Sequence, residues 1–440
     1  MKVSELTQAP QLTGDEIFHV VKDGVSYKAT VSDIVASAPN EKGVYPDVPI
    51  NRVTIRRYSG QSSTVMSVSD NLAMIDRIMA LCFPALVDRS SHIAAILNGN
   101  DIRKTADGLA ATLDDWTLQV MTRVGGFYRK YEYNAATNEK IFKFSVYPVK
   151  GYKYVRRRFL PIFGGCVESH DGKSVMVSNS GKWTTQNTPI QNFHTYAKNL
   201  GSSFRGMAVQ DMEVFRFLFW LYHKTFNSQS VRSGLSVVSS AEWQAFSQAA
   251  DGGQSSYAQF AKTGFSLNIQ GMDGELTDTW CGHTCKPNRF LWSECLLNGM
   301  YWIAGGGYLK KGSTWYKVND LANIAFSITA NYSAICTEPA VQSGYSDGGF
   351  IMEDFEDTMI PSQLGGSATT GHADRYWRVA SPGADTVYMP LLVGGAFYGS
   401  NVGVSVLSAN TVPSLSLASC GGALASDDPT DPTPDNTVVV

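Results

Sequence analysis

Glycine is the residue that most restricts how this chain can fold. The sequence contains 40 glycines among 440 residues, and many of them lie in its second half. Frequent glycines interrupt regular elements and mark turns, so they favour short strands and long loops over a doubly wound sheet of long helices and buried strands. We therefore expect an α+β fold that is mostly β.

The charge of the chain argues against a nucleic-acid partner. The net charge is -3 and 17% of the residues are charged, whereas a sequence-independent grip on nucleic acid needs a basic face that displaces counterions. The basic clusters Arg56-Arg57 and Arg156-Arg157-Arg158 are short and lie in strand-like surroundings. We interpret both clusters as solvated faces or contacts between subunits.

Neither secretion nor a membrane span is indicated. The first residues, MKVSELTQAP, have no apolar segment behind Lys2, unlike a secretory signal peptide. The densest apolar run, residues 215–222, is far shorter than the roughly 20 residues that a spanning helix needs. The 7 cysteines are an odd number spread over a long chain, which favours buried, reduced thiols over a disulfide framework. We expect a protein made in a cytoplasm, without membrane insertion.

The start of the chain predicts a small N-terminal β module, residues 1–40. The β-rich runs 17–21 and 25–31 flank a turn formed by Lys22, Asp23 and Gly24, which together predict a hairpin. Residues 41–150 form a second unit, with a helix predicted within 70–82 from its apolar spacing and a β-rich remainder. Its predicted strands are 116–124, 127–133 and 140–146.

The remainder of the chain, residues 151–425, reads as one irregular, glycine-rich unit. Residues 210–224 have helical apolar spacing, and residues 193–200 before them look like a strand. The last residues, 426–440, have the sequence SDDPTDPTPDNTVVV, which is mostly too polar and too rich in proline to pack. We expect an extended, flexible tail there.

The best metal candidate is a group of three thiols and an imidazole. Cys281, His283, Cys285 and Cys295 lie within 15 residues, and zinc accepts that ligand set. The spacing differs from the paired C-x2-C pattern of common structural zinc sites, and no second close cysteine pair exists in the sequence. A loop with small buried thiols is the favoured interpretation, so we expect no metal there.

The sequence gives little evidence for a hydrolase. The 7 histidines are scattered in neutral surroundings and no G-x-S-x-G elbow is present. The acidic run 353–357 could supply a glycosidase carboxylate pair or a structural calcium site, but it lacks the regular oxygen spacing of a calcium loop. A solvated acidic face is the favoured interpretation. Gly305, Gly306 and Gly307 lack the Lys and Ser or Thr of a P-loop and are expected to form turns.

The tract from Gly394 to Leu424 is the most unusual part of the sequence. It carries no charged residue and no Gln, Met or Trp, and glycines punctuate it. Small polar, aliphatic and aromatic residues lie between these glycines without an evident period. Because glycines permit special backbone conformations, such a tract suits a scaffold that carries an exchangeable surface. The expected glycine frame is Gly394, Gly395, Gly399, Gly403, Gly421 and Gly422.

Three stretches resemble a known family. Residues 193–204 and the helix at 215–226 are similar to a segment of phage tail proteins with a C-type-lectin-like, formylglycine-generating-enzyme-type fold. The run Phe290-Leu-Trp292-Ser-Glu294 looks like that family's central W-x-E-type strand. The tract from 394 to 424 follows the variable-region pattern of proteins diversified by retroelements, although Phe397 and Ala423 stand where the family usually has Trp and Arg.

The resemblance implies a receptor-binding protein of the phage tail tip or tail fibre. Such proteins are usually homotrimers whose N-terminal module joins other tail proteins and whose lectin-like domain, here residues 151–425, meets the bacterial surface. Residues 41–150 then form the intermediate, trimerisation region. Retroelement mutagenesis replaces adenines in the gene, so the diversified codons encode a restricted set of residues that excludes Lys, Glu, Gln, Met and Trp. The tract contains none of these five residues. The family implies a virion protein that is not an enzyme and has no cofactor, although calcium can brace such loops.

The family's variable positions map onto particular residues of the tract. Phe397 and Tyr398 are aromatic types that anchor interfaces, and Ser408, Thr411 and Ser419 would make a poor core. The expected receptor-binding positions are Ala396, Phe397, Tyr398, Ser408, Thr411, Leu415, Leu417 and Ser419. The weaker candidates are Tyr388, Ser405, Val406 and Ala423.

Two other classes remain open at the level of sequence. A cellular ligand-binding protein of the same fold would carry a signal or lipid-attachment sequence. An enzyme of the same fold would be either a depolymerase of surface polysaccharide or an oxidase, and fold analogy alone licenses neither. The oxidase needs two cysteines close together, for which Cys420 with Cys336 or Cys281 is the candidate pair.

Overall fold

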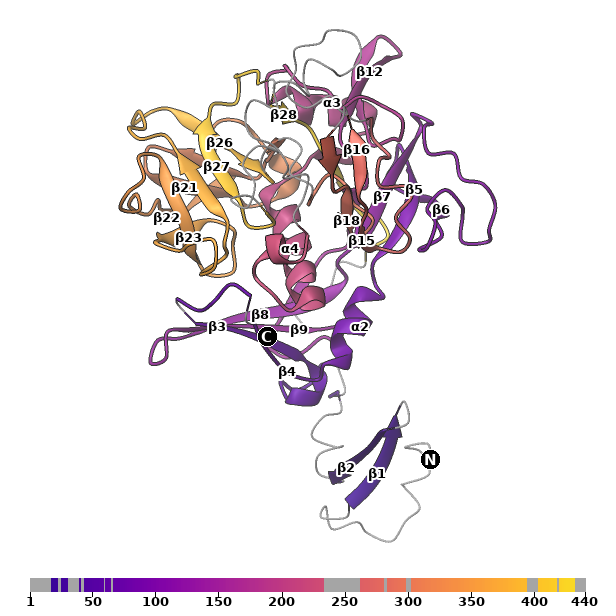
Figure 1. Ribbon diagram of the computed structural model, residues 1–440, viewed down its shortest axis with the longest axis vertical. Helices are drawn as coiled ribbons and strands as arrows, with labels where there is room; N and C mark the ends of the chain where they lie inside the picture. Colours follow the sequence, from indigo (N-terminus) through magenta and orange to yellow (C-terminus); the bar gives the residue numbers. More distant parts are fainter. Residues whose placement is uncertain are drawn as a thin grey trace.

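The computed structural model shows an α+β protein that is mostly β, as expected (Figure 1). The strands of its body gather in three larger sheets around a central helix, α4 (Val209–His223). The residues that the structure describes are 17–22, 25–30, 39–40, 43–58, 60–64, 66–232, 262–280, 283–297, 302–393, 403–417 and 419–431.

The N-terminal hairpin is confirmed. β1 (Ile17–Lys22) and β2 (Val25–Thr30) pair antiparallel, with Ile17 opposite Thr30. The strand ends agree with the sequence pattern to within one residue. Most of the remaining module, up to residue 40, lies outside the described residues.

The first sheet has the strand order β10-β8-β9-β3-β4. Its strands are β3 (Val53–Tyr58), β4 (Ser67–Asp70), β8 (Phe127–Asn134), β9 (Glu139–Ser145) and β10 (Lys153–Val155). Val53, Ile55, Phe142 and Phe144 alternate along β3 and β9 and are buried, which is the period-two pattern of a strand with one face on a core. The strands predicted at 127–133 and 140–146 are confirmed.

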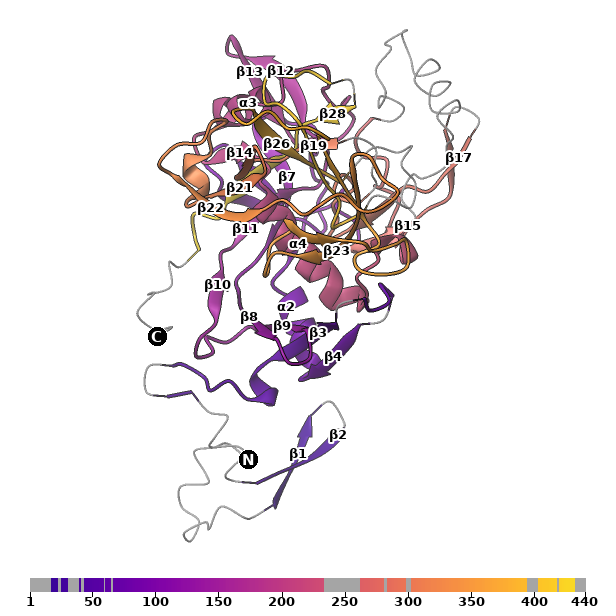
Figure 2. The same ribbon diagram turned by 90° about the vertical axis from the view of Figure 1, so that its left-hand side faces the viewer.

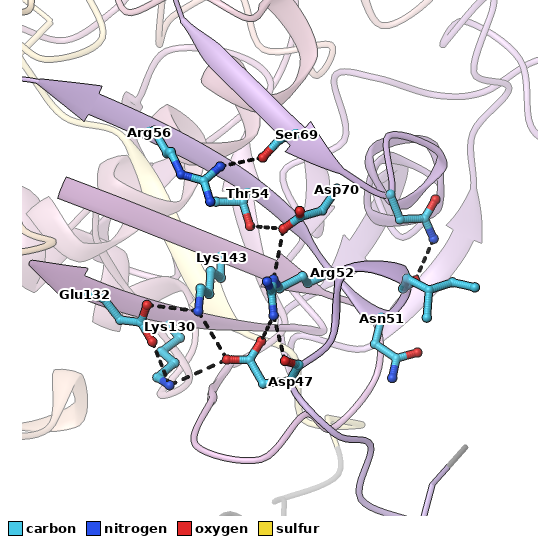
Figure 3. Close-up of polar contacts among 12 residues, drawn as sticks. Asp47, Asn51, Arg52, Thr54, Arg56, Ser69, Asp70, Lys130, Glu132 and Lys143 are labelled. Carbon is cyan, nitrogen blue, oxygen red and sulfur yellow. Dashed lines mark hydrogen bonds and ion pairs between the residues drawn. The ribbon is translucent and has the colours of Figure 1, made fainter. Parts of the chain in front are cut away.

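The opposite face of the first sheet carries a network of ion pairs (Figure 3). Asp47, on the segment that leads into β3, accepts hydrogen bonds from Arg52 and, at 3.2 Å, from Lys143. Tyr152 donates its hydroxyl to Asp47 at 2.9 Å. Lys143 also pairs with Glu132 at 2.9 Å. These contacts attach the segment before β3 to the sheet.

The helix α4 confirms the prediction for residues 210–224 and lies between all three sheets (Figures 1 and 2). Its Phe217 ring lies 5.6 Å from Phe144 of the first sheet, and Asp211 and Arg216 reach the second and third sheets. A shorter helix, α2 (Ala73–Met79), lies within the predicted 70–82 segment. Among the described helices, none is long and apolar enough to cross a membrane.

The second sheet joins distant parts of the chain, in the order β14-β29-β11-β7-β5-β6. Its strands are β5 (Phe83–Asp88), β6 (Ile93–Ile96), β7 (Leu118–Val124), β11 (Arg158–Pro161), β14 (Phe204–Gly206) and β29 (Leu424–Asp427). Because β7 pairs with β11 and β29 pairs with β11 and β14, strands on both sides of the expected boundary at residue 150 share one sheet. The boundary between 41–150 and 151–425 therefore does not separate two sheets.

The third sheet is curled and holds the C-terminal tract, with the main order β22-β21-β20-β26-β27-β25-β23-β24 and β19 and β28 beside β26. Its strands are β19 (Trp302–Ala304), β20 (Tyr308–Lys311), β21 (Thr314–Val318), β22 (Tyr332–Thr337), β23 (Gly348–Asp354), β24 (Pro361–Leu364), β25 (Arg375–Arg378), β26 (Val387–Leu392), β27 (Leu407–Thr411) and β28 (Cys420–Gly421).

Smaller elements complete the described structure. Three short hairpin-like pairs join β12 (Cys166–His170) to β13 (Lys173–Val177), β15 (Asp273–Glu275) to β18 (Asn288–Phe290), and β16 (Asp278–Trp280) to β17 (His283–Cys285). Single 3-10 turns are η2 (Pro49–Asn51), η3 (Ser228–Ser230) and η4 (Leu321–Asn323).

The strand expected at residues 193–200 is wrong. This segment is a helix, α3 (Asn192–Leu200). Phe193, Ala197 and Leu200 are buried at helical spacing, while the polar residues between them are not all buried. The aromatic and β-branched residues in the segment favour a strand locally, and packing against β13 and β14 overrides that preference.

Several charged residues expected at the surface are buried. Arg57 is 2% exposed and Arg158 is 8% exposed, so these two are not solvated as predicted. In the acidic run 353–357, Glu353 is 8% and Asp354 is 4% exposed, which contradicts a solvated acidic face for these two. Each of the four has an oppositely charged partner, as burial of a charge requires.

The predicted start of the flexible tail, at residue 426, is wrong, because residues 426–431 pack against the rest of the protein. Ser426 and Asp427 end the strand β29. Asp428 is 4% exposed and binds Arg123 at 2.8 Å, and Asp431 accepts the Tyr154 hydroxyl at 2.6 Å. Residues 426–431 are therefore attached to the second and first sheets. Residues 432–440 lie outside the described residues.

Candidate functional site

The C-terminal tract enters the described structure at Gly403. Six of its expected positions lie outside the described residues: Gly394, Gly395, Ala396, Phe397, Tyr398 and Gly399. The described part runs through β27, then a connection that we name the C-terminal loop, residues 412–419, and then β28. Figure 1 shows β27 beside β26, and β28 near α3.

Four of the expected binding positions are buried. Ser408 is 2%, Thr411 3%, Tyr388 6% and Ser405 0% exposed, so the expectation that Ser408 and Thr411 make a poor core is wrong. Their hydroxyl groups both donate to the side-chain oxygen of Asn410, at 2.8 and 3.0 Å. Because these hydrogen bonds are satisfied within the strand, burial costs little. Val406 and Ala423, the weaker candidates, are also buried.

The C-terminal loop is held by its main chain. Asn187 donates its backbone N–H to the Leu417 carbonyl at 3.1 Å, and Ile190 donates to the Leu415 carbonyl at 3.2 Å. Gln191 donates to the Pro413 carbonyl at 3.0 Å. These bonds do not involve loop side chains, so they do not depend on which residue occupies each loop position.

Among the described residues of the tract, the exposed side chains are those of Asn410 and of Ser414, Leu415 and Ser416 in the C-terminal loop. Leu415 is 42% exposed, and Ser414 and Ser416 beside it are exposed. Leu417 and Ser419 are half-buried. Of the expected binding positions that the structure describes, Leu415, Leu417 and Ser419 are therefore the ones that reach the surface.

The glycine frame has a different physical basis from the one expected. Gly403 and Gly422 do not have positive φ angles. A Cβ atom on Gly422 would lie 2.5 Å from both Met176 Sδ and Phe193 Cδ1, and one on Gly403 would lie 2.1 Å from Ser228 Oγ. At both glycines a side chain would force the neighbouring side chains to shift, because their atoms approach so closely.

A stack of aromatic rings and one arginine lies beside β27, and sequence reasoning missed it. The Arg375 guanidinium lies 4.8 Å from the ring centres of both Tyr345 and Trp377, and it pairs with Asp347 at 3.3 Å. Trp377 pairs with Ser408 across β25 and β27. Arg, Tyr and Trp are the residue types that dominate binding interfaces. The compact run of Arg375, Tyr376, Trp377 and Arg378 is the signal that could have drawn attention to it.

A buried ionic cluster lies beside Ser405 of the tract; it consists of Arg57, Arg216, Asp354 and His372. Asp354 Oδ2 lies 2.8 Å from Arg216 Nη1 and 2.8 Å from His372 Nε2. Burial and the neighbouring Arg57 lower the pKa of His372 to about 3, so the imidazole is neutral at physiological pH. The guanidinium and imidazole beside Asp354 lower the pKa of that carboxyl despite its burial. Because its members come from elements far apart in the sequence, no local sequence motif predicts the cluster.

The zinc candidate is only partly described. Cys281 and the side chains of His283 and Cys285 lie outside the described part of the chain. Cys295 is buried, and burial raises the pKa of its thiol to about 12, which disfavours the thiolate that zinc requires. Among the described residues, no group of three or more His, Cys, Asp or Glu side chains is placed to hold a metal ion.

The thiols that the structure describes are free. Cys82, Cys166, Cys295 and Cys420 are buried and Cys336 is half-buried, so the expectation of mostly buried, reduced thiols is confirmed for these five. Burial raises the pKa of Cys336 to about 12 and raises the pKa of Cys420 as well. Reactive cysteines have lowered thiol pKa values, so neither has the environment of a redox nucleophile.

The expected central W-x-E strand is a turn. β18 ends at Phe290, and the following Leu291 and Trp292 have φ angles of 49° and 61°. Trp292 donates its indole N–H to the Gly99 carbonyl at 2.7 Å. This bond connects the turn to the segment that follows β6. Glu294 accepts backbone hydrogen bonds from Gly264 and Ser266. Both residues therefore act as tertiary ties rather than as members of a strand.

No protein-family model matches this chain, and no curated protein matches it at a significant level.

Proposed function

We propose that this chain is a non-enzymatic phage tail protein that attaches the virion to its bacterial host through the C-terminal loop. The resemblance of the tract to retroelement-diversified receptor-binding proteins suggests the activity. The single observation that carries it here is the main-chain attachment of residues 412–419 to residues 187–191. A surface that must change its side chains without losing its shape needs this kind of support.

The exposed side chains suit that role. Leu415 presents an apolar surface that costs little conformational freedom on binding, and hydroxyl-bearing Ser414 and Ser416 flank it. Half-buried Tyr345 and Arg375 are residue types common at interface centres, whereas Trp377 beside them is 6% exposed and belongs to the core.

Within this proposal the remaining parts of the chain have supporting roles. The N-terminal module, residues 1–40, joins other tail proteins, and three copies of the chain assemble as a homotrimer. Several weak sites on one particle raise the effective concentration of each, so a modest affinity per loop suffices for attachment. The receptor is a protein or polysaccharide of the bacterial surface.

Binding of the purified chain to host cells tests the proposal. A fluorescent full-length chain is incubated with the host bacterium, and bound protein is measured by flow cytometry together with competition against phage adsorption. Leu415→Asp is expected to reduce cell binding at least tenfold, because a charge in a desolvated contact costs more than about 1.4 kcal/mol.

Leu109→Asp is the matched control. Leu109 is also an exposed leucine, at 66%. It lies in the segment that follows β6, far from the C-terminal loop in sequence. The control is expected to bind cells like the wild type. Equal binding by wild type and Leu415→Asp, or equal loss in both variants, contradicts attachment through the C-terminal loop.

A further inference from the structure

Asp374 occupies an unusual position between the buried ionic cluster and the tract. It lies just before β25, after Ala373, whose φ of 61° is rare for a residue with a side chain. The backbone there is tied to β23, because Ile351 donates its N–H to the Asp374 carbonyl at 2.9 Å. The Asp374 side chain is 0% exposed. The structure therefore holds this carboxyl in the interior at the cost of an uncommon backbone conformation.

Residues 403–405 of the tract lie directly against this carboxyl. Ser405 donates its backbone N–H to Asp374 Oδ2 at 2.8 Å, and Val404 donates its backbone N–H to Ser228 Oγ at 3.1 Å. A Cβ atom on Gly403 would lie 2.6 Å from Asp374 Oδ1 and 2.1 Å from Ser228 Oγ. Asp374 Oδ1 and Ser228 Oγ thus both lie against the Cα of Gly403, and a side chain there would force them to move.

The charges around Asp374 do not neutralise it. Arg216 of α4 uses one Nη atom on Asp354 and the other on the Thr358 carbonyl, both at 2.8 Å. Asp354 of β23 is a second carboxylate, and the neutral His372 lies between it and Arg57 of β3. Among the described residues, Asp374 Oδ1 has no hydrogen-bond partner. An ionised Asp374 would therefore be a buried charge without a cation of its own.

We propose that Asp374 is a positioning residue for the tract: as a neutral carboxylic acid it holds Gly403–Ser405 against the core, and loss of its proton to solvent releases them. In the neutral form no charge has to be hydrated, and Oδ2 accepts from the Ser405 N–H. In the ionised form, hydration of the charge requires the covering backbone to move away, because Gly403–Ser405 is the segment that contacts both carboxyl oxygens.

The electrostatics agree with this assignment. Burial raises the pKa of Asp374 to about 8, with Asp354 adding to the increase and Ser405 and Arg216 opposing it. The carboxyl is thus neutral at pH 7 and ionises in mildly alkaline solution. The proposal rests on the proposed function only for its consequence, which is that host attachment weakens above about pH 8.

Hydrogen exchange tests the positioning without any receptor. Backbone amide protection of the peptide that contains residues 404–407 is measured by mass spectrometry from pH 6 to 9.5, corrected for intrinsic exchange, on the full-length wild type and Asp374→Asn. The wild type is expected to lose protection by roughly tenfold between pH 7 and 9, as expected for a group that ionises near the middle of that range. Asp374→Asn, which is always neutral and nearly the same shape, is expected to keep its protection throughout.

Two further variants make the result specific. Glu294→Gln removes another buried carboxyl whose pKa is raised, and that carboxyl bonds to Gly264 and Ser266 instead of the tract. It is expected to leave the wild-type profile of residues 404–407 unchanged. Ser228→Ala removes the acceptor of the Val404 N–H but keeps the Asp374 carboxyl, so protection is expected to be lower at pH 6 and still to fall between pH 7 and 9; this variant carries the test if Asp374→Asn does not fold.

Identical profiles for wild type and Asp374→Asn overturn the proposal, as does a wild-type profile that is flat across the whole pH range. A Ser228→Ala profile that is flat between pH 7 and 9 overturns it in the same way. Host-cell binding measured in parallel at pH 7 and 9 separates the two proposals. Loss of exchange protection without any cell binding at pH 7 supports the positioning role and contradicts the attachment function.

Discussion

Asn187 donates its backbone N–H to the carbonyl oxygen of Leu417, at 3.1 Å, across more than half the length of the chain. This bond joins the segment before α3 to the C-terminal loop, and Pro189 and Ser416 form a bridge beside it. The loop therefore has its shape set by the main chain of another segment. The exposed side chains of Ser414, Leu415 and Ser416 are left free to vary, which is the property that links the fold to the proposed attachment.

Loop and strand positions of the tract should differ in tolerance. Leu415→Ser is expected to change the free energy of unfolding by less than about 0.5 kcal/mol, because Leu415 is 42% exposed. Ser408→Leu is expected to cost about 1 to 3 kcal/mol, because Ser408 is 2% exposed and its hydroxyl bonds to Asn410. Urea denaturation measures both, and equal losses contradict the division.

Gly422 should not accept a side chain. Gly422→Ala is expected to destabilise the protein by about 1 to 3 kcal/mol, since its Cβ would lie 2.5 Å from Met176 Sδ and Phe193 Cδ1. Gly99→Ala is the control, because its Cβ would meet Trp292 at an ordinary 3.5 Å. Thermal melting of the two variants measures the difference. A loss for Gly99→Ala as large as for Gly422→Ala contradicts close approach as the reason for the glycine.

Glu294 should make the protein less stable as pH rises. Burial raises its pKa from 4.5 to about 7. Between these values the folded state binds more protons than the unfolded state, so stability is highest below about pH 4.5 and falls until about pH 7.

Glu294→Gln is expected to remove this contribution, which amounts to at most about 3 kcal/mol. Urea denaturation of wild type and Glu294→Gln at pH 5 and pH 7.5 measures it. An equal pH dependence in the two proteins contradicts the raised pKa.

The segment after β29 should contribute to stability. Asp428→Ala is expected to cost about 2 to 4 kcal/mol, because the Asp428 side chain is 1% exposed and Arg123 would lose its partner at 2.8 Å. Asp385→Ala is the control, since Asp385 pairs with Lys311 at 3.0 Å but is 95% exposed. Equal effects in urea denaturation contradict a packed C-terminal segment.

Sequence variation should follow exposure. If retroelement mutagenesis diversifies this gene, sibling phages are expected to differ at the codons for Leu415, Leu417 and Ser419. The buried Ser408 and Thr411 are expected to change rarely, because a larger side chain would not fit there and their hydroxyls bond to Asn410. Sequencing the gene from siblings measures this, and substitutions spread evenly along it contradict diversification.

Local patterns predicted the elements whose stability is local. The apolar spacing of α4 and the alternation of β8 and β9 are visible in the sequence, and all three form within a few residues of the expected ends. The helix α3 was missed because its short sequence favours a strand until it packs against β13 and β14. Tertiary packing decided that segment.

The candidate site was harder to predict because its partners are distant in sequence. The bonds from Asn187 and Ile190 to the C-terminal loop, and those between Asp374 and Ser405, involve segments that no local pattern connects. Burial of Ser408 depended on Asn410, whose side chain satisfies a hydroxyl that looks exposed in the sequence. A polar residue with a hydrogen-bonding partner in the same strand can therefore be buried, so its polarity alone does not predict that it is exposed.

Site-specific photo-crosslinking tests the central claim most directly. A photoreactive phenylalanine derivative is placed at Leu415, and in a control protein at Leu109, and each protein is irradiated on intact host cells. Attachment through the C-terminal loop predicts a covalent adduct with a cell-surface component from position 415 and none from position 109. Adducts from 109 but not from 415, or none from either on cells that bind the protein, contradict the account.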